Sequence, residues 1–153
     1  MAVGEFEELL DMGWRETLRG MIFPFHCDHM GHVNNRWYGH FFDDASMSLW
    51  SAVGISEVGL RAKFDTSAVI ARNEFDYRHE LLNGQQFVVV SAFRRLGSKS
   101  VTFESRLYHD FTGTLCVTNI SVAVFFDFTS RQSSPMPSSI RDLLESVVVK
   151  SAD

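Results

Sequence analysis

The sequence has few cysteines, no long apolar run and no excess of positive charge, and each absence excludes a class of protein. Its two cysteines, Cys27 and Cys116, are too few for the disulfide framework of a small secreted domain. No apolar run approaches the ~20 residues of a membrane-spanning helix, and the acidic N-terminus lacks the pattern of a secretory signal. The net charge of −5 gives no overall basic surface for nucleic acid. We therefore expect a cytoplasmic protein with neither a membrane nor a nucleic-acid partner.

The composition that remains is that of a globular chain. Its length of 153 residues suits one domain, residues 1–153, with a single core. Hydrophobic residues make up 45% and charged residues 22%, which excludes a disordered or fibrous protein. Fourteen phenylalanines predict an aromatic-rich interior or interface.

A long helix is predicted in the first half of the chain. Apolar residues recur there at spacings of three and four, which places them on one helical face. These residues are Tyr38, Phe41, Phe42, Ala45 and Leu49. Asn34 or Asn35 is a suitable N-cap, because an asparagine side chain accepts a hydrogen bond from a free amide of the first turn. Gly54 follows the last periodic residues and is a natural stop.

Extended segments surround this helix. Residues 14–25 read as a strand before it, and a connection at residues 55–64 follows it. Four more strand-like runs come next, at residues 67–82, 87–96, 100–109 and 115–128. Short turns between them, including Asn83-Gly84, imply antiparallel pairing. The last run is mostly apolar and is expected to be covered on both faces. We predict an α+β fold in which a curved antiparallel sheet wraps around one long central helix.

Titratable side chains are concentrated between the first strand and the helix, in residues 26–35. Asp28 is the candidate catalytic carboxylate, although a loop aspartate often only caps its own turn. His26, His29 and His32 suggest a metal site as an alternative. A spacing of three within a loop is not a usual zinc-ligand pattern, so we expect no metal.

The order of elements and the stretch after Cys27 resemble the hotdog fold, and specifically the 4-hydroxybenzoyl-CoA thioesterase-like family of acyl-CoA thioesterases. The shared pattern is an aspartate, two residues, a glycine and then His-Val-Asn-Asn before an aromatic residue. It stands here as Asp28-His-Met-Gly-His-Val-Asn-Asn-Arg-Trp-Tyr38. Weaker similarities lie at residues 75–81, 96–100, 126–127 and 135–137. Together they cover nearly the whole chain.

The resemblance implies hydrolysis of an acyl-CoA thioester, with Asp28 as nucleophile or as general base toward water. The backbone amide of Asn35, at the start of the helix, is the candidate donor to the thioester oxygen. The other candidates within the motif are Gly31, His32, Asn34 and Tyr38. Two departures loosen any inference about the substrate, because His26 replaces an acidic residue of some relatives and Asp43 replaces a glutamate that is common later in the helix.

A basic turn offers a second candidate contact with substrate. Arg95, Ser98 and Lys99 lie at the turn between two predicted strands, where they form either a solvated hairpin end or a contact with the phosphates of CoA. In hotdog proteins CoA often lies near this turn, frequently at a subunit boundary. A sheet edge that pairs across a two-fold axis would give a homodimer or a homotetramer.

Three functions follow from these expectations. The first is acyl-CoA hydrolysis without a cofactor, which the intact Asp28 motif favours. The second is binding of an acyl thioester without hydrolysis, as in a sensor or carrier. The third, a hotdog dehydratase or hydratase, needs a histidine paired with an acid to move a proton from carbon. The sequence leaves the acyl group open, because specificity depends on the shape of the pocket.

Overall fold

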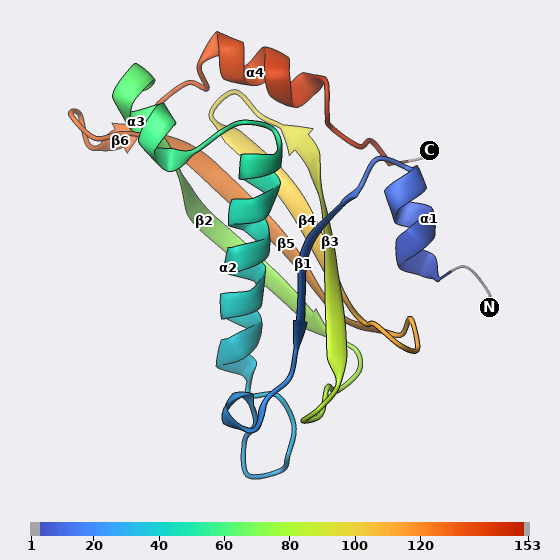
Figure 1. The fold of residues 1–153 in the computed structure, drawn as a ribbon. Helices are drawn as coiled ribbons and strands as arrows, with labels where there is room; N and C mark the ends of the chain where they lie inside the picture. The colour runs from blue at the N-terminus through green and yellow to red at the C-terminus, as the bar shows by residue number, and fades with distance from the viewer. Residues whose placement is uncertain (1–3, 152–153) are drawn as a thin grey trace.

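The computed structural model describes residues 4–151 and shows a strongly curled antiparallel sheet with one long helix lying across it (Figure 1). The helices are α1 (Glu5–Asp11), α2 (Asn35–Ala52), α3 (Glu57–Phe64) and α4 (Ser138–Glu145), with a 3₁₀ turn at Pro24–His26. The strands are β1 (Arg15–Met21), β2 (Thr66–Tyr77), β3 (Gln86–Leu96), β4 (Ser100–His109), β5 (Leu115–Asp127) and β6 (Gln132–Ser133). The predicted α+β architecture is confirmed. Among the described residues, no helix has the length and apolar character needed to cross a membrane.

The main strands follow the order β1-β3-β4-β5-β2, and every neighbouring pair is antiparallel. β2 is the outer strand at one edge, and its ladder with β5 runs from Thr66 opposite Asp127 to Tyr77 opposite Val117. Within residues 4–151, β2 has a neighbour on one side only. Such an edge presents a row of unpaired backbone N–H and C=O groups.

Helix α2 begins at the predicted position. Asn34 is its N-cap, and the Asn34 side chain accepts a hydrogen bond from the Arg36 amide at 3.2 Å. The residues of its buried face are those that the spacing predicted: Tyr38, Phe41, Phe42, Ala45 and Leu49. This face packs on β1, β3 and β4. Strand β2 therefore extends beyond the part of the sheet that α2 covers, and most of its residues after Ala68 are exposed.

The core beneath α2 has two parts, one at each end of the helix. At the N-terminal end, Phe41 packs in a cluster with Ile22 and Leu107. At the C-terminal end, Leu49 packs in a second cluster with Phe93 and Phe103. These two clusters fix both ends of α2 against the sheet, because a helix holds its place mainly by burying an apolar face.

Residues 55–64 differ from the expectation of a simple connection, because α3 forms within them. Ser56 caps this helix by accepting a hydrogen bond from the Gly59 amide at 3.1 Å, and Asp65 ends it in the left-handed conformation with φ of 52°. Only Leu60 of α3 is buried. A single buried position gives no helical period, and the glycines at 54 and 59 are typical of a loop.

Three other boundaries or environments also differ from the sequence-based expectation. The first strand ends at Met21, four residues early, because Pro24 begins a 3₁₀ turn. The second predicted run ends at Tyr77 rather than at residue 82. Strand β5 is interior to the sheet but is covered on one face only, since Ile120 on its outer face is 39% exposed. Its apolar outer face is therefore open in a single copy of the chain.

Candidate active site

The loop before α2 is organised by Asp28. The Asp28 amide donates to the His32 carbonyl at 2.8 Å, and the Gly31 amide donates to the Asp28 carbonyl at 3.1 Å. One carboxylate oxygen, Oδ1, accepts hydrogen bonds from the Met30 amide at 2.8 Å and from the His32 amide at 3.4 Å. Gly31 has φ of +79°, a conformation that favours glycine. Asp28 and Gly31 thus shape a tight loop that returns the chain to the start of α2.

The second oxygen of Asp28 is left available by this arrangement. Within the described residues, Oδ2 accepts no hydrogen bond from protein groups. The side chain of Asp28 is half-buried, so this oxygen remains open to a ligand or to water. The loop therefore holds the carboxylate by one oxygen and presents the other.

The loop also fixes where α2 begins. The Asn34 amide donates to the His26 carbonyl at 2.8 Å, and the Val33 amide donates to the Leu81 carbonyl at 3.0 Å. Asn34 is the N-cap, so Asn35 supplies the first amide of the helix proper. In the described part of the chain no acceptor is found for that amide. A free amide at the positive end of a helix dipole is suited to bind an anionic oxygen.

Asp28 and Asn35 line one open cavity of about 320 Å³. Its other lining residues are His32, Val33, Tyr38, Tyr77, Arg78, His79 and Glu80. The structure therefore brings together four residues that the sequence singled out: Asp28, His32, Asn35 and Tyr38. Asn34 caps the helix beside this cavity and Gly31 shapes the loop, so neither lines the cavity wall.

Sequence reasoning did not identify the opposite wall of this cavity. His32 Nε2 lies 2.8 Å from Glu80 Oε2, and Arg78 adds a positive charge nearby. These residues follow β2, and the isolated bridge between His32 and Leu82 brings them to the loop. The only available signal was the weak family similarity at residues 75–81, which did not show that this segment meets the Asp28 loop.

The histidines of the loop do not converge. His26 is buried and its Nδ1 accepts a hydrogen bond from the Phe23 amide at 2.9 Å. Burial lowers the pKa of His26 from its ordinary value of 6.5. His29 is exposed, whereas His32 faces Glu80. Across residues 4–151, no three histidine, cysteine or acidic side chains come together in an arrangement that would hold a metal ion.

The basic turn lies far from this cavity in a single copy of the chain. Arg95, Ser98 and Lys99 stand at the β3–β4 turn, beside α4 and at the end of the sheet opposite the Asp28 loop (Figure 1). The Met136 amide donates to the Ser98 carbonyl at 3.0 Å, which ties the turn to the C-terminal segment. The 18 residues of α2 separate the two ends by about 27 Å. One chain does not bring this turn to Asp28.

Comparison with known families identifies the class of protein that carries this fold and site. Residues 24–144 match the family model described as the thioesterase-like superfamily. This match covers most of the chain and includes the Asp28 loop, α2 and all the strands except β1. The chain belongs to the thioesterase-like superfamily. A search of curated protein sequences finds no significant match.

Solved structures support the same fold. A Staphylococcus aureus protein in complex with CoA is 18% identical, with 92% of this chain and 89% of that chain covered and a TM-score of 0.80. A 1,4-dihydroxy-2-naphthoyl-CoA thioesterase from Synechocystis is 13% identical, with coverage of 84% and 94% and a TM-score of 0.75. A probable thioesterase from Escherichia coli is 18% identical, with coverage of 88% and 99% and a TM-score of 0.75. The predicted hotdog fold is confirmed.

Proposed function

We propose that the protein hydrolyses an acyl-CoA thioester at the cavity between Asp28 and the start of α2. One observation carries this proposal. The Asp28 carboxylate, which has one oxygen without a protein hydrogen bond, and the free Asn35 amide at the start of α2 line the same cavity. The reaction needs a group that activates or supplies a nucleophile and a donor that stabilises negative charge on the carbonyl oxygen. Asp28 and the Asn35 amide supply these two parts.

In the general-base form of the reaction, Asp28 Oδ2 takes a proton from water as the water oxygen attacks the thioester carbon. The carbonyl oxygen becomes an oxyanion and accepts a hydrogen bond from the Asn35 amide. The carbon–sulfur bond then breaks, and the CoA thiolate receives the proton from Asp28. In the nucleophilic form, Asp28 attacks the carbon itself and releases CoA, and water then hydrolyses the mixed anhydride.

The relatives support the choice of substrate. One solved structure of this fold contains CoA, and another belongs to a thioesterase that acts on an aryl-CoA. Arg78 stands at the cavity, where a guanidinium group suits a phosphate of CoA. Arg95, Ser98 and Lys99 remain proposed CoA contacts, and they serve a site at Asp28 only if a second copy of the chain brings them to it.

We also propose that the protein is at least a homodimer paired through β2. A two-fold axis near Asn73 would place Arg72 of each copy opposite Glu74 of the other, and both side chains are exposed. This charge pattern is complementary to itself in an antiparallel pair. Val69 and Ile70 of the same strand, which are 39% and 45% exposed, would be covered. Pairing of this kind would give hydrogen-bond partners to the unpaired backbone N–H and C=O groups of β2.

The test is release of CoA thiol from a panel of acyl-CoAs by the wild type and by Asp28→Asn. Asparagine keeps an oxygen that accepts the Met30 and His32 amides but cannot act as a base or nucleophile. We expect kcat/KM to fall by about a hundredfold or more with no change in thermal unfolding. Asp44→Asn, which removes an exposed carboxylate of α2, is the matched control and should retain activity.

One observation favours the alternative of binding without hydrolysis. Asp28 Oδ1 already holds the loop through two amides, which is the role of a purely structural aspartate. If no acyl-CoA is hydrolysed but several bind saturably by calorimetry, the protein is a binding module. If Asp28→Asn remains fully active, hydrolysis uses another group.

A further inference from the structure

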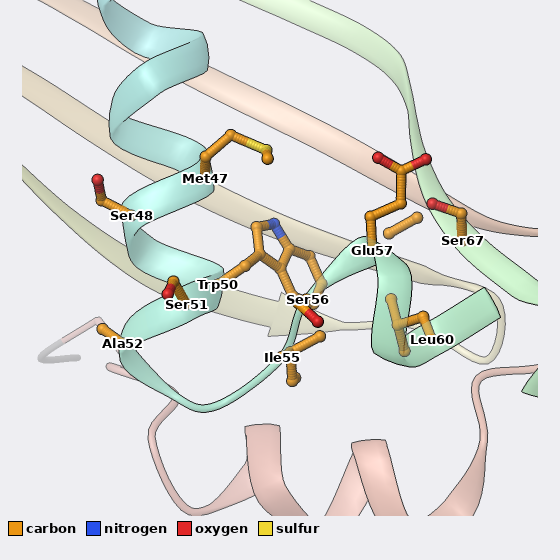
Figure 2. Close-up of a pocket in the computed structure, with 11 residues that line it drawn as sticks. Met47, Ser48, Trp50, Ser51, Ala52, Ile55, Ser56, Glu57, Leu60 and Ser67 are labelled. Atoms are coloured by element: carbon orange, nitrogen blue, oxygen red, sulfur yellow. The ribbon is translucent and has the colours of Figure 1, made fainter. Parts of the chain in front are cut away.

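Two different environments lie at the end of the molecule opposite the Asp28 loop. One is a cavity of about 650 Å³ between the C-terminal part of α2, α3 and the first residues of β2. Figure 2 shows Met47 and Trp50 projecting from α2 toward Leu60 of α3. The polar groups of its lining are serine hydroxyls and the Glu57 carboxylate, and the described residues that line it include no basic side chain. This cavity therefore disfavours an anionic ligand.

The second environment is the β3–β4 turn, residues 97–99, which lies beside α4 (Figure 1). The Gly97 amide closes the turn by donating to the Ser100 carbonyl at 2.8 Å. An added Cβ at Gly97 would collide with the Ser100 hydroxyl oxygen, so the turn needs glycine at this position. The Ser98 carbonyl accepts a hydrogen bond from the Met136 amide at 3.0 Å, which directs that carbonyl into the protein.

Arg141 of α4 also holds this turn. Its Nη2 atom donates to the Gly97 carbonyl at 2.5 Å and to the Ser98 carbonyl at 3.5 Å. Two buried residues of α4, Ile140 and Leu144, fix the helix beside the turn. Within residues 4–151, Arg141 forms no ion pair with a carboxylate. Its positive charge is therefore not neutralised by an ion pair where it meets the turn.

The amides of the turn are fixed by these bonds to its carbonyls. In a trans peptide the N–H of one residue points away from the C=O of the residue before it. Carbonyls of Gly97 and Ser98 that point inward therefore direct the Ser98 and Lys99 amides outward. Both residues are exposed, and no acceptor for either amide is found in the described part of the chain. Successive free amides of this kind bind anions, and the Lys99 and Arg95 side chains add positive charge.

We propose that Arg141 is a positioning residue for the binding of CoA. It holds the Gly97 and Ser98 carbonyls inward and thereby directs the Ser98 and Lys99 amides at a phosphate of CoA. The inference rests on the proposed function, in which this turn contacts the phosphates of an acyl-CoA. Arg141 itself lies on the inner side of the turn and acts through the backbone.

The test measures binding and hydrolysis in Arg141→Gln, which removes the charge and the planar fork of donors. We expect the Kd for free CoA, measured by calorimetry, to rise by about tenfold. In the thiol-release assay, KM for the best acyl-CoA should rise by a similar factor while kcat is unchanged. The same acyl group on pantetheine, which has no phosphate, should be hydrolysed with unchanged kcat/KM. A residue that only stabilised the fold would affect both esters alike.

Two further variants serve as controls. Arg141→Lys keeps the charge but loses the fork that reaches two carbonyls, so we expect an intermediate rise in Kd of about threefold. It tests the inference even if Arg141→Gln does not fold, which thermal unfolding would reveal. Arg61→Gln is the matched charge control, because Arg61 lies on α3 with its guanidinium over the Phe128 ring at 4.1 Å. Its Kd for CoA should stay within about twofold of the wild-type value.

The outcomes separate this inference from the proposed function. An unchanged Kd for CoA in both Arg141 variants would overturn the inference, as would equal losses of kcat/KM with the CoA and pantetheine esters. A wild type that binds CoA but hydrolyses no ester would refute the proposed hydrolysis, and the Kd series would then decide the role of Arg141. A wild type that neither binds CoA nor hydrolyses its esters would refute both.

Discussion

The two ends of α2 differ in the kinds of residue that surround them. At the N-terminal end, backbone amides and titratable side chains surround an open cavity, and Asp28, His32 and Glu80 lie within it. At the C-terminal end, the helix packs on phenylalanines and borders a cavity with a single carboxylate. The titratable groups therefore lie at the N-terminal end of α2, and the apolar cavity lies at its C-terminal end.

A helix is a suitable element for this division. Its N-terminus has free amides and a positive dipole end, while its C-terminal half has no such advantage for an oxyanion. An apolar cavity is therefore best placed at the C-terminal end of the helix, away from the loop that positions Asp28.

The largest expected effect tests whether the N-terminal end acts through its backbone. Asn35→Pro deletes the amide of the first helical residue, a position at which proline is well tolerated. Asn34 has φ of −67° and ψ of 138°, which is compatible with a following proline. We expect kcat for the best acyl-CoA to fall by about 10²–10³ with little change in thermal unfolding.

Asn35→Ala is the control for this change, because it removes the side chain and keeps the amide. It should retain most of the activity in the same thiol-release assay. If Asn35→Pro is as active as Asn35→Ala, the oxyanion donor is not the Asn35 amide. The N-terminal end of α2 would then contribute no backbone donor at that position.

The sequence predicted the N-terminal end better than the C-terminal end. The period of Phe41, Ala45 and Leu49 determined the buried face of α2, and the Asn34 cap marked its start, because both signals are local. The family motif indicated Asp28 for the same reason. Glu80 was missed because its approach to His32 depends on how the chain returns after β2, which no local pattern encodes.

The C-terminal cavity was missed for a related physical reason. Its wall combines Met47, Leu60 and Ser67 from three separate elements, and the element that carries Leu60 is the unpredicted α3. Trp50 also lines this cavity, and its ring packs edge-on against three phenylalanines of the sheet, Phe93, Phe103 and Phe125. A cavity lined by several elements leaves no periodic pattern in the sequence, so local spacing does not predict it.

A smaller effect is expected at Gly39, the fifth residue of α2. An added Cβ there would meet no atom within 4 Å, and the residue lies inside α2. Gly39→Ala should raise the free energy of unfolding by about 1 kcal/mol in urea titration, because alanine favours the helix. Because Gly39 does not line the Asp28 cavity, activity should not change. A stabilised variant with a large loss of activity would show that substrate uses the space beside Gly39.

The smallest expected effect is that of low pH. As the pH falls, the N-terminal end of α2 should lose protection from hydrogen exchange before the C-terminal end does. Burial lowers the pKa of His26 below its ordinary value of 6.5, so the unfolded chain binds this proton more readily than the folded chain does. The stability that neutral His26 contributes is therefore complete above the unfolded value and is lost as the pH falls below it.

Hydrogen exchange measures this difference directly. The Asn34 amide is bonded to the His26 carbonyl and the Phe23 amide to its ring, so both should exchange faster at pH 5 than at pH 7 after correction for intrinsic rates. Amides of β4 next to Phe103 should change less, because that cluster consists of apolar side chains. His26→Asn keeps an acceptor for the Phe23 amide but does not titrate, and it should remove the dependence on pH. An equal response at both ends would show that acid acts on the whole fold rather than on the His26 packing.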